Sequence, residues 1–154
     1  MIVKIKKLND LAKEPVKAHD KDFCYDVYAT SCEEVEPGVW KYGIGLAFEI
    51  VRPEWTGQWK ALNGFILSLD FRPRSSVWKT GLSLSNCEGT IDELYRGEVI
   101  AYFYEVIPGK EKYKVGDRIG QIKLGITLPI CFEEVDELNM DTERGTGGFG
   151  STGR

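Results

Sequence analysis

Two segments of this chain alternate apolar residues with other residues, and a period of two is the signature of a β-strand. Successive side chains of a strand point to opposite faces of a sheet, so each apolar set would line one buried face. The two sets are Ile44, Leu46, Phe48 and Ile50, and then Phe65, Leu67, Leu69 and Phe71. The chain is therefore expected to build its core from sheets and to contain little helix.

Further strands are expected on both sides of these two. An apolar segment begins at Ile2, a β-branched and aromatic run covers 99–107, and two more candidates cover 118–124 and 128–135. Turn signals rich in glycine, proline and aspartate, such as Pro108-Gly109, separate the runs. Short strands divided in this way predict an all-β fold, an antiparallel jelly-roll-like sandwich or barrel.

Length and charge narrow the possible partners. The 154 residues suit one domain, and a net charge of −4 argues against DNA or RNA as a bulk partner while leaving room for a nucleotide. The sequence has no apolar run near the roughly 20 residues of a membrane span and no signal-peptide core, so a soluble, cytoplasmic protein is expected. Four irregularly spaced cysteines disfavour a zinc or disulfide framework, and the single histidine, His19, is expected at the surface.

The last eleven residues combine arginines, glycines, hydroxyls and one aromatic side chain. Arg144 offers a planar charged fork for phosphate, while glycine backbone near Gly150 and the hydroxyls of Ser151 and Thr152 add donors. Phe149 has no apolar neighbours and is free to stack on a flat ring. We expect a β domain over 1–138 and a mobile tail over 139–154 that closes over a phosphorylated ligand. A disordered, solubilising terminus is the alternative.

Three internal segments carry polar residues beyond the needs of a fold. Residues 71–76 present Arg74, Ser75 and Ser76 after a strand, as a phosphate grip or as a simple strand cap. Residues 86–98 place Asp92 three residues before Tyr95, as a general base beside a sugar platform or as a charged surface hairpin. Residues 116–121 end in Gln121, as a phosphate donor or as an ordinary turn. Taken alone, segment 86–98 is better explained as a surface hairpin, and segment 116–121 as an ordinary turn.

Taken together and in order, five segments resemble the five motifs of the trimeric dUTP diphosphatases: 22–27, 73–76, 89–98, 116–121 and 144–153. The resemblance covers nearly the whole chain. The chain departs from the family pattern at three places. Phe23 and Cys24 stand where small residues are usual, and Leu94 replaces a common acidic residue. The segment 51–64, with two tryptophans, is longer than usual and is expected to be a folded excursion over a hydrophobic surface or a peripheral flap.

The resemblance implies an activity and an assembly. It implies Mg²⁺-dependent hydrolysis of dUTP to dUMP and pyrophosphate, which limits uracil in DNA and supplies dUMP. Asp92 would activate the water that attacks the α-phosphorus, and Asp26 would reach the metal through water. It also implies a homotrimer with active sites shared between subunits, and no nucleic-acid or membrane partner.

The resemblance further implies a set of substrate contacts. Uracil would be read by the hairpin that carries Asn86, Gly89 and Ile91, and Tyr95 would lie beneath the deoxyribose. Phe149 would stack on the base as the tail closes with Gly150. The implied phosphate donors are Arg74, Ser75, Ser76, Gln121, Arg144, Ser151 and Thr152. Two alternatives remain open: a dCTP deaminase of the same fold, and a non-catalytic nucleotide sensor that binds a protein partner.

Overall fold

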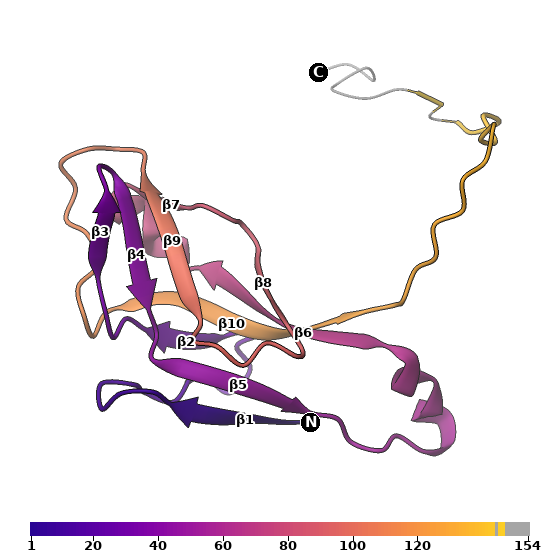
Figure 1. Ribbon diagram of the computed structural model, residues 1–154, viewed down its shortest axis with the longest axis horizontal. Helices are drawn as coiled ribbons and strands as arrows, with labels where there is room; N and C mark the ends of the chain where they lie inside the picture. Colours follow the sequence, from indigo (N-terminus) through magenta and orange to yellow (C-terminus); the bar gives the residue numbers. More distant parts are fainter. Residues whose placement is uncertain (144, 147–154) are drawn as a thin grey trace.

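A computed structural model describes residues 1–143 and 145–146, without the side chains of residues 59 and 62. Its elements are short strands and two 3-10 helices, as Figure 1 shows. The strands are β1 (Ile2–Lys7), β2 (Tyr25–Tyr28), β3 (Glu33–Glu36), β4 (Val39–Gly43), β5 (Leu46–Val51), β6 (Ile66–Pro73), β7 (Leu82–Leu84), β8 (Gly89–Asp92), β9 (Ile100–Glu105) and β10 (Arg118–Thr127). The helices are η1 (Gly57–Gly64) and η2 (Ser75–Thr80).

All strand pairs are antiparallel. One four-stranded sheet has the order β2-β10-β6-β8, a second has the order β3-β4-β9-β7, and β1 pairs with β5. This arrangement confirms the all-β, jelly-roll-like class. Within the described residues, no helix has the length and apolar content required to cross a membrane.

The core forms from the alternating apolar faces that the sequence predicted. Leu67, Leu69 and Phe71 of β6 are each at most 5% exposed, and they join Leu46 and Phe48 of β5 in one cluster. Burying a side chain of this size contributes roughly 1.5–3 kcal/mol, so each of these residues stabilises the fold substantially.

Three aromatic rings complete the core beside the second sheet. Tyr42, Phe103 and Tyr113 meet edge to face, with ring centroids 5.6–6.2 Å apart. Burial raises the pKa of the Tyr42 and Tyr113 hydroxyls above the usual value, since charge is disfavoured away from water. These hydroxyls therefore stay protonated at any physiological pH.

The expected strand over 128–135 is wrong. β10 continues to Thr127, and the described chain beyond it leaves the body without a strand partner (Figure 1). Leu128, Ile130 and Phe132 keep the alternating pattern but are 60%, 73% and 89% exposed. Alternation alone does not make a strand, because the backbone groups need a neighbouring strand for their hydrogen bonds. The domain boundary at 138 stays a prediction.

The outer face of the β2-β10-β6-β8 sheet carries polar residues in register. Asp92 pairs with Ser68, Gln121 pairs with Arg72, and Asp26 pairs with Gln121. Because side chains alternate along each strand, these residues share the face opposite Leu69 and Phe71. One sheet therefore holds several of the expected site residues.

Candidate active site

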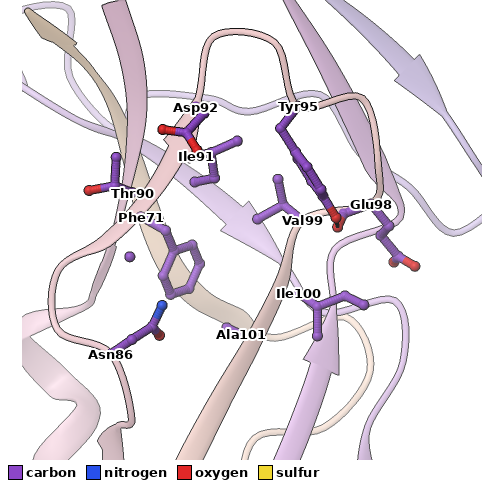
Figure 2. A pocket seen from close by; sticks show the side chains of 11 residues that line it. Phe71, Asn86, Thr90, Ile91, Asp92, Tyr95, Glu98, Val99, Ile100 and Ala101 are labelled. Atoms are coloured by element: carbon purple, nitrogen blue, oxygen red, sulfur yellow. Dashed lines mark hydrogen bonds between the residues drawn. The ribbon is translucent and has the colours of Figure 1, made fainter.

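The segment from β8 to β9 lines a pocket of about 210 Å³. The hairpin expected over 86–98 is wrong, because β8 pairs with β6 while β9 pairs with β4 and β7 in the other sheet. Five of the residues predicted from sequence line it: Asn86, Gly89, Ile91, Asp92 and Tyr95. Figure 2 shows Asp92 and Tyr95 at one end and the amide of Asn86 at the other. The structure adds six lining residues that the sequence did not indicate: Phe71, Thr90, Glu98, Val99, Ile100 and Ala101. The pocket thus offers a carboxylate, an aromatic face and an amide around an apolar floor.

Tyr95 is held close to the backbone of its own turn. Its amide donates to the Asp92 carbonyl at 3.0 Å, and its hydroxyl donates to the Glu98 carbonyl at 2.9 Å. A Cβ at Gly97 would lie 2.3 Å from the Tyr95 hydroxyl oxygen, so any side chain there would force the Tyr95 ring to move. Tyr95 is 47% exposed and lines the pocket, so part of it is accessible to a ligand.

Residues from other parts of the chain also contact the turn that carries Asp92 and Tyr95. Gly45 donates its amide to Glu98 Oε1 at 2.8 Å. The Arg52 guanidinium bonds Glu93 and holds the pKa of that carboxyl below its usual value, mainly through these hydrogen bonds. The turn is therefore anchored by residues far away in the sequence.

A second polar cluster surrounds Asp26, which is only 3% exposed. Its carboxylate accepts from Gln121 Nε2 at 2.9 Å and Arg118 Nη1 at 2.9 Å, and it lies 3.3 Å from Arg74 Nε. Arg74 directly precedes η2, whose first residue is Ser75. The sequence predicted Arg74, Gln121 and Asp26 as site residues, but no sequence signal indicated that Arg118 would bind Asp26.

The two clusters do not meet within one subunit. Asp92 lies opposite Ser68 on β6, whereas Arg74 lies six residues further along, beyond the end of β6. At about 3.3 Å per residue the separation is about 20 Å. A single copy of the chain therefore presents the Asp92 pocket and the Asp26 cluster as two separate sites.

The Asp26 cluster suits a metal that arrives with an anionic ligand better than a resident one. The described residues contain no group of three or more histidine, cysteine or acidic residues placed to hold a metal ion. Asp26 already accepts from Arg118 and Gln121, and two guanidinium groups beside it would repel a bare dication. An anionic ligand would offset that repulsion, and the remaining lone pairs of Asp26 suit a metal-bound water.

The tail residues of the predicted site, Arg144, Phe149, Gly150, Ser151 and Thr152, lie outside the described residues. Ser75 is exposed and Ser76 is half-buried at the start of η2, beside Arg74. His19 is exposed, as the sequence predicted.

Comparisons with known proteins agree on one family. A family model described as dUTPase matches residues 61–153. Deoxyuridine 5'-triphosphate nucleotidohydrolases of Alkaliphilus metalliredigens and Nautilia profundicola are each 36% identical, over 98% and 100% of this chain and 96% and 100% of their own lengths. That of Clostridium acetobutylicum is 37% identical over 98% of this chain and 96% of its own length.

Solved structures share the fold. A point mutant of the Staphylococcus bacteriophage 80alpha dUTPase with dUpNHpp has a TM-score of 0.77 at 22% identity, and 99% of each chain is covered. A mutant dUTPase from phage phi11 of S. aureus, described with a coordinated structural Mg(II) ion, has a TM-score of 0.66 at 19% identity, covering 90% of this chain and 99% of its own.

Proposed function

The chain belongs to the dUTPase family and hydrolyses dUTP to dUMP and pyrophosphate, and from this premise we propose how its residues divide the work. The observation that carries the proposal is the pocket lined by the segment from β8 to β9. Asp92 and Tyr95 lie at one end of it and Asn86 at the other (Figure 2). Uracil occupies the pocket, and the reacting phosphate lies beside Asp92.

Asp92 orients and deprotonates the water that attacks the α-phosphorus. The carboxylate closes β8 and faces the solvent, where a water can approach it. The bond from water oxygen to phosphorus forms as the bond to the β-phosphate oxygen breaks, and pyrophosphate leaves with those electrons. The proton passes to Asp92.

Selection of base and sugar comes from the rest of the pocket. Main-chain groups of β8 around Gly89 and Ile91, with the Asn86 amide, read the uracil edge. Cytosine reverses the donor and acceptor pattern and would leave buried groups unpaired, which rejects it strongly. The exposed face of Tyr95 packs under the deoxyribose and leaves no room for a 2′-hydroxyl.

The triphosphate is held by the second cluster of another subunit. Arg74, Ser75, Ser76 and Gln121 bind and neutralise its oxygens, which stabilises the charge of the transition state. Asp26 would hold Mg²⁺ through a bound water, and the metal would further neutralise the phosphate oxygens when bound. The tail with Arg144, Phe149, Gly150, Ser151 and Thr152 covers the occupied site.

Homotrimer formation places the Asp92 pocket of one subunit beside the Asp26 cluster of another. The separation of about 20 Å between Asp92 and Arg74 in one subunit supports shared sites. The exposed apolar segment that follows β10, with Leu128, Ile130 and Phe132, also favours contact with another copy. Three copies in a ring would repeat one head-to-tail interface.

Pyrophosphate release from dUTP, dCTP, dTTP and UTP, compared between the wild type and Asp92→Asn, tests the assignment. We expect release from dUTP alone and its loss in the variant. Ammonia release from dCTP would instead indicate a deaminase, and dUTP binding without cleavage would indicate a sensor.

Subunit mixing tests the shared site. Asp92→Asn and Arg74→Ala subunits, each inactive alone, are unfolded and refolded together. A head-to-tail ring then contains about one site in four with both an intact base and an intact arginine, so activity should return. A mixture that stays inactive, although native mass spectrometry shows mixed trimers, would place Asp92 and Arg74 of one subunit in the same site.

A further inference from the structure

Arg52 lies at the start of the 51–64 excursion, directly after β5. Its side chain contacts the turn that follows Asp92. We propose that Arg52 is a positioning residue for Asp92, acting through Glu93. The inference rests on the proposed role of Asp92 as the base. Arg52 itself does not line the pocket.

Three hydrogen bonds occupy the Arg52 guanidinium. Nε and Nη2 each lie 2.5 Å from a different oxygen of Glu93, and Nη1 donates to the Phe65 carbonyl at 2.7 Å. The pairing is bidentate, which fixes direction as well as distance. The Arg52 and Glu93 side chains are 33% and 18% exposed, so solvent screens this pair less than a fully exposed one.

The contact acts beside an edge strand. β8 is the edge strand of its sheet, and β6 is its only strand neighbour among the described residues. β8 ends at Asp92, and Glu93 is the next residue. Arg52 joins Glu93 to Phe65, which lies three residues before Ser68, the strand partner of Asp92. The turn after Asp92 is therefore tied both to the end of β5 and to the approach of β6.

The excursion is folded rather than open, so it can act as a support. Asn63 closes it: its Nδ2 donates to the Trp55 carbonyl at 3.0 Å, and its Oδ1 accepts from the Trp55 amide at 3.4 Å. η1 occupies its second half, and Figure 1 shows it at the end of the molecule where β5 stops and β6 begins. Arg52, at the start of this excursion, contacts the turn that follows Asp92.

A double-mutant cycle tests the proposal. We expect Arg52→Ala and Glu93→Ala each to lower kcat for dUTP between about tenfold and a hundredfold, because a shift of about 1 Å in a reacting group has that effect. KM should change much less than kcat, since the nucleotide pocket is untouched. The double variant should be no worse than either single one, and Arg52→Lys should recover part of kcat.

Lys4→Ala is the matched control. Lys4 pairs with Glu49 at 3.3 Å between exposed side chains on β1 and β5, and neither residue lines the pocket, so its loss should leave kcat unchanged. Thermal unfolding of each variant, with assays run well below each midpoint, separates positioning from loss of folded protein.

Different results would refute the role of Arg52 and the role of Asp92. Wild-type kcat in Arg52→Ala, a loss confined to KM, or additive losses in the double variant would each overturn the role of Arg52. Turnover that survives Asp92→Asn would instead overturn the proposed base, whatever Arg52 does. The Asp92→Asn assay is therefore run beside the cycle.

Discussion

Replacing Gly97 by alanine is expected to displace the Tyr95 ring and to impair both turnover and sugar selection. The added Cβ would lie 2.3 Å from the Tyr95 hydroxyl oxygen and 2.6 Å from Cζ. Ordinary contacts between such atoms are about 3.5 Å, so the ring must move by about 1 Å or more. Because Tyr95 is 47% exposed, it can swing outward instead of breaking the fold.

The expected losses of stability and activity follow from the contacts that the Tyr95 ring would lose. The bond from the Tyr95 hydroxyl to the Glu98 carbonyl, 2.9 Å long, contributes about 1 kcal/mol, and its loss should lower the unfolding midpoint by about 2–4 °C. A platform misplaced by about 1 Å should lower kcat/KM for dUTP by up to about a hundredfold. Discrimination against UTP should fall as well, because the face that excludes a 2′-hydroxyl has moved.

Steady-state kinetics with dUTP and UTP, together with thermal unfolding, measure these effects. Gly64→Ala is the matched control, since a Cβ there meets nothing within 4 Å. If Gly97→Ala kept wild-type kcat/KM for dUTP and wild-type discrimination against UTP, the role assigned to the Tyr95 ring would be refuted.

Three further predictions concern stability and assembly. Arg52 lowers the folded-state pKa of Glu93, so the stabilisation is complete above the unfolded pKa of about 4.3 and is lost as pH falls through the lower folded value. Melting curves should therefore show Glu93→Gln less stable than wild type at pH 7 and equal to it under acidic conditions. Gly120→Ala puts a Cβ 2.2 Å from Phe71 Cζ and should reduce the urea-derived free energy of unfolding by about 1–3 kcal/mol, with no change refuting the tight fit. Phe132→Ser should shift sedimentation from trimer toward smaller species and leave each subunit folded.

Local patterns predicted the parts of the fold that depend on near neighbours. The alternation in β5 and β6 was confirmed because buried and exposed faces follow from a period of two. The same alternation over 128–135 misled, because the segment has no partner strand in the described chain. β3, with the sequence Glu-Glu-Val-Glu, was missed because every residue is exposed and only pairing with β4 makes it a strand.

The candidate site likewise contains residues that the sequence predicted and contacts that it did not. Asn86, Gly89, Asp92 and Tyr95 lie within ten residues and line one pocket. Their spacing alone favoured a charged surface hairpin, and only the resemblance to the family assigned them to one site. The sequence also determined the family, through five ordered motifs that span most of the chain.

Only the tertiary structure decided which distant groups meet. Arg118 binds Asp26 across 92 residues, and Arg52 binds Glu93 across 41. Neither pair has a spacing signal, because strand order and register decide which side chains become neighbours across a sheet. The same register places Asp92 about 20 Å from Arg74, although both belong to predicted motifs. Residue types and local spacing determine what each segment can do, and the pairing of strands determines which segments do it together.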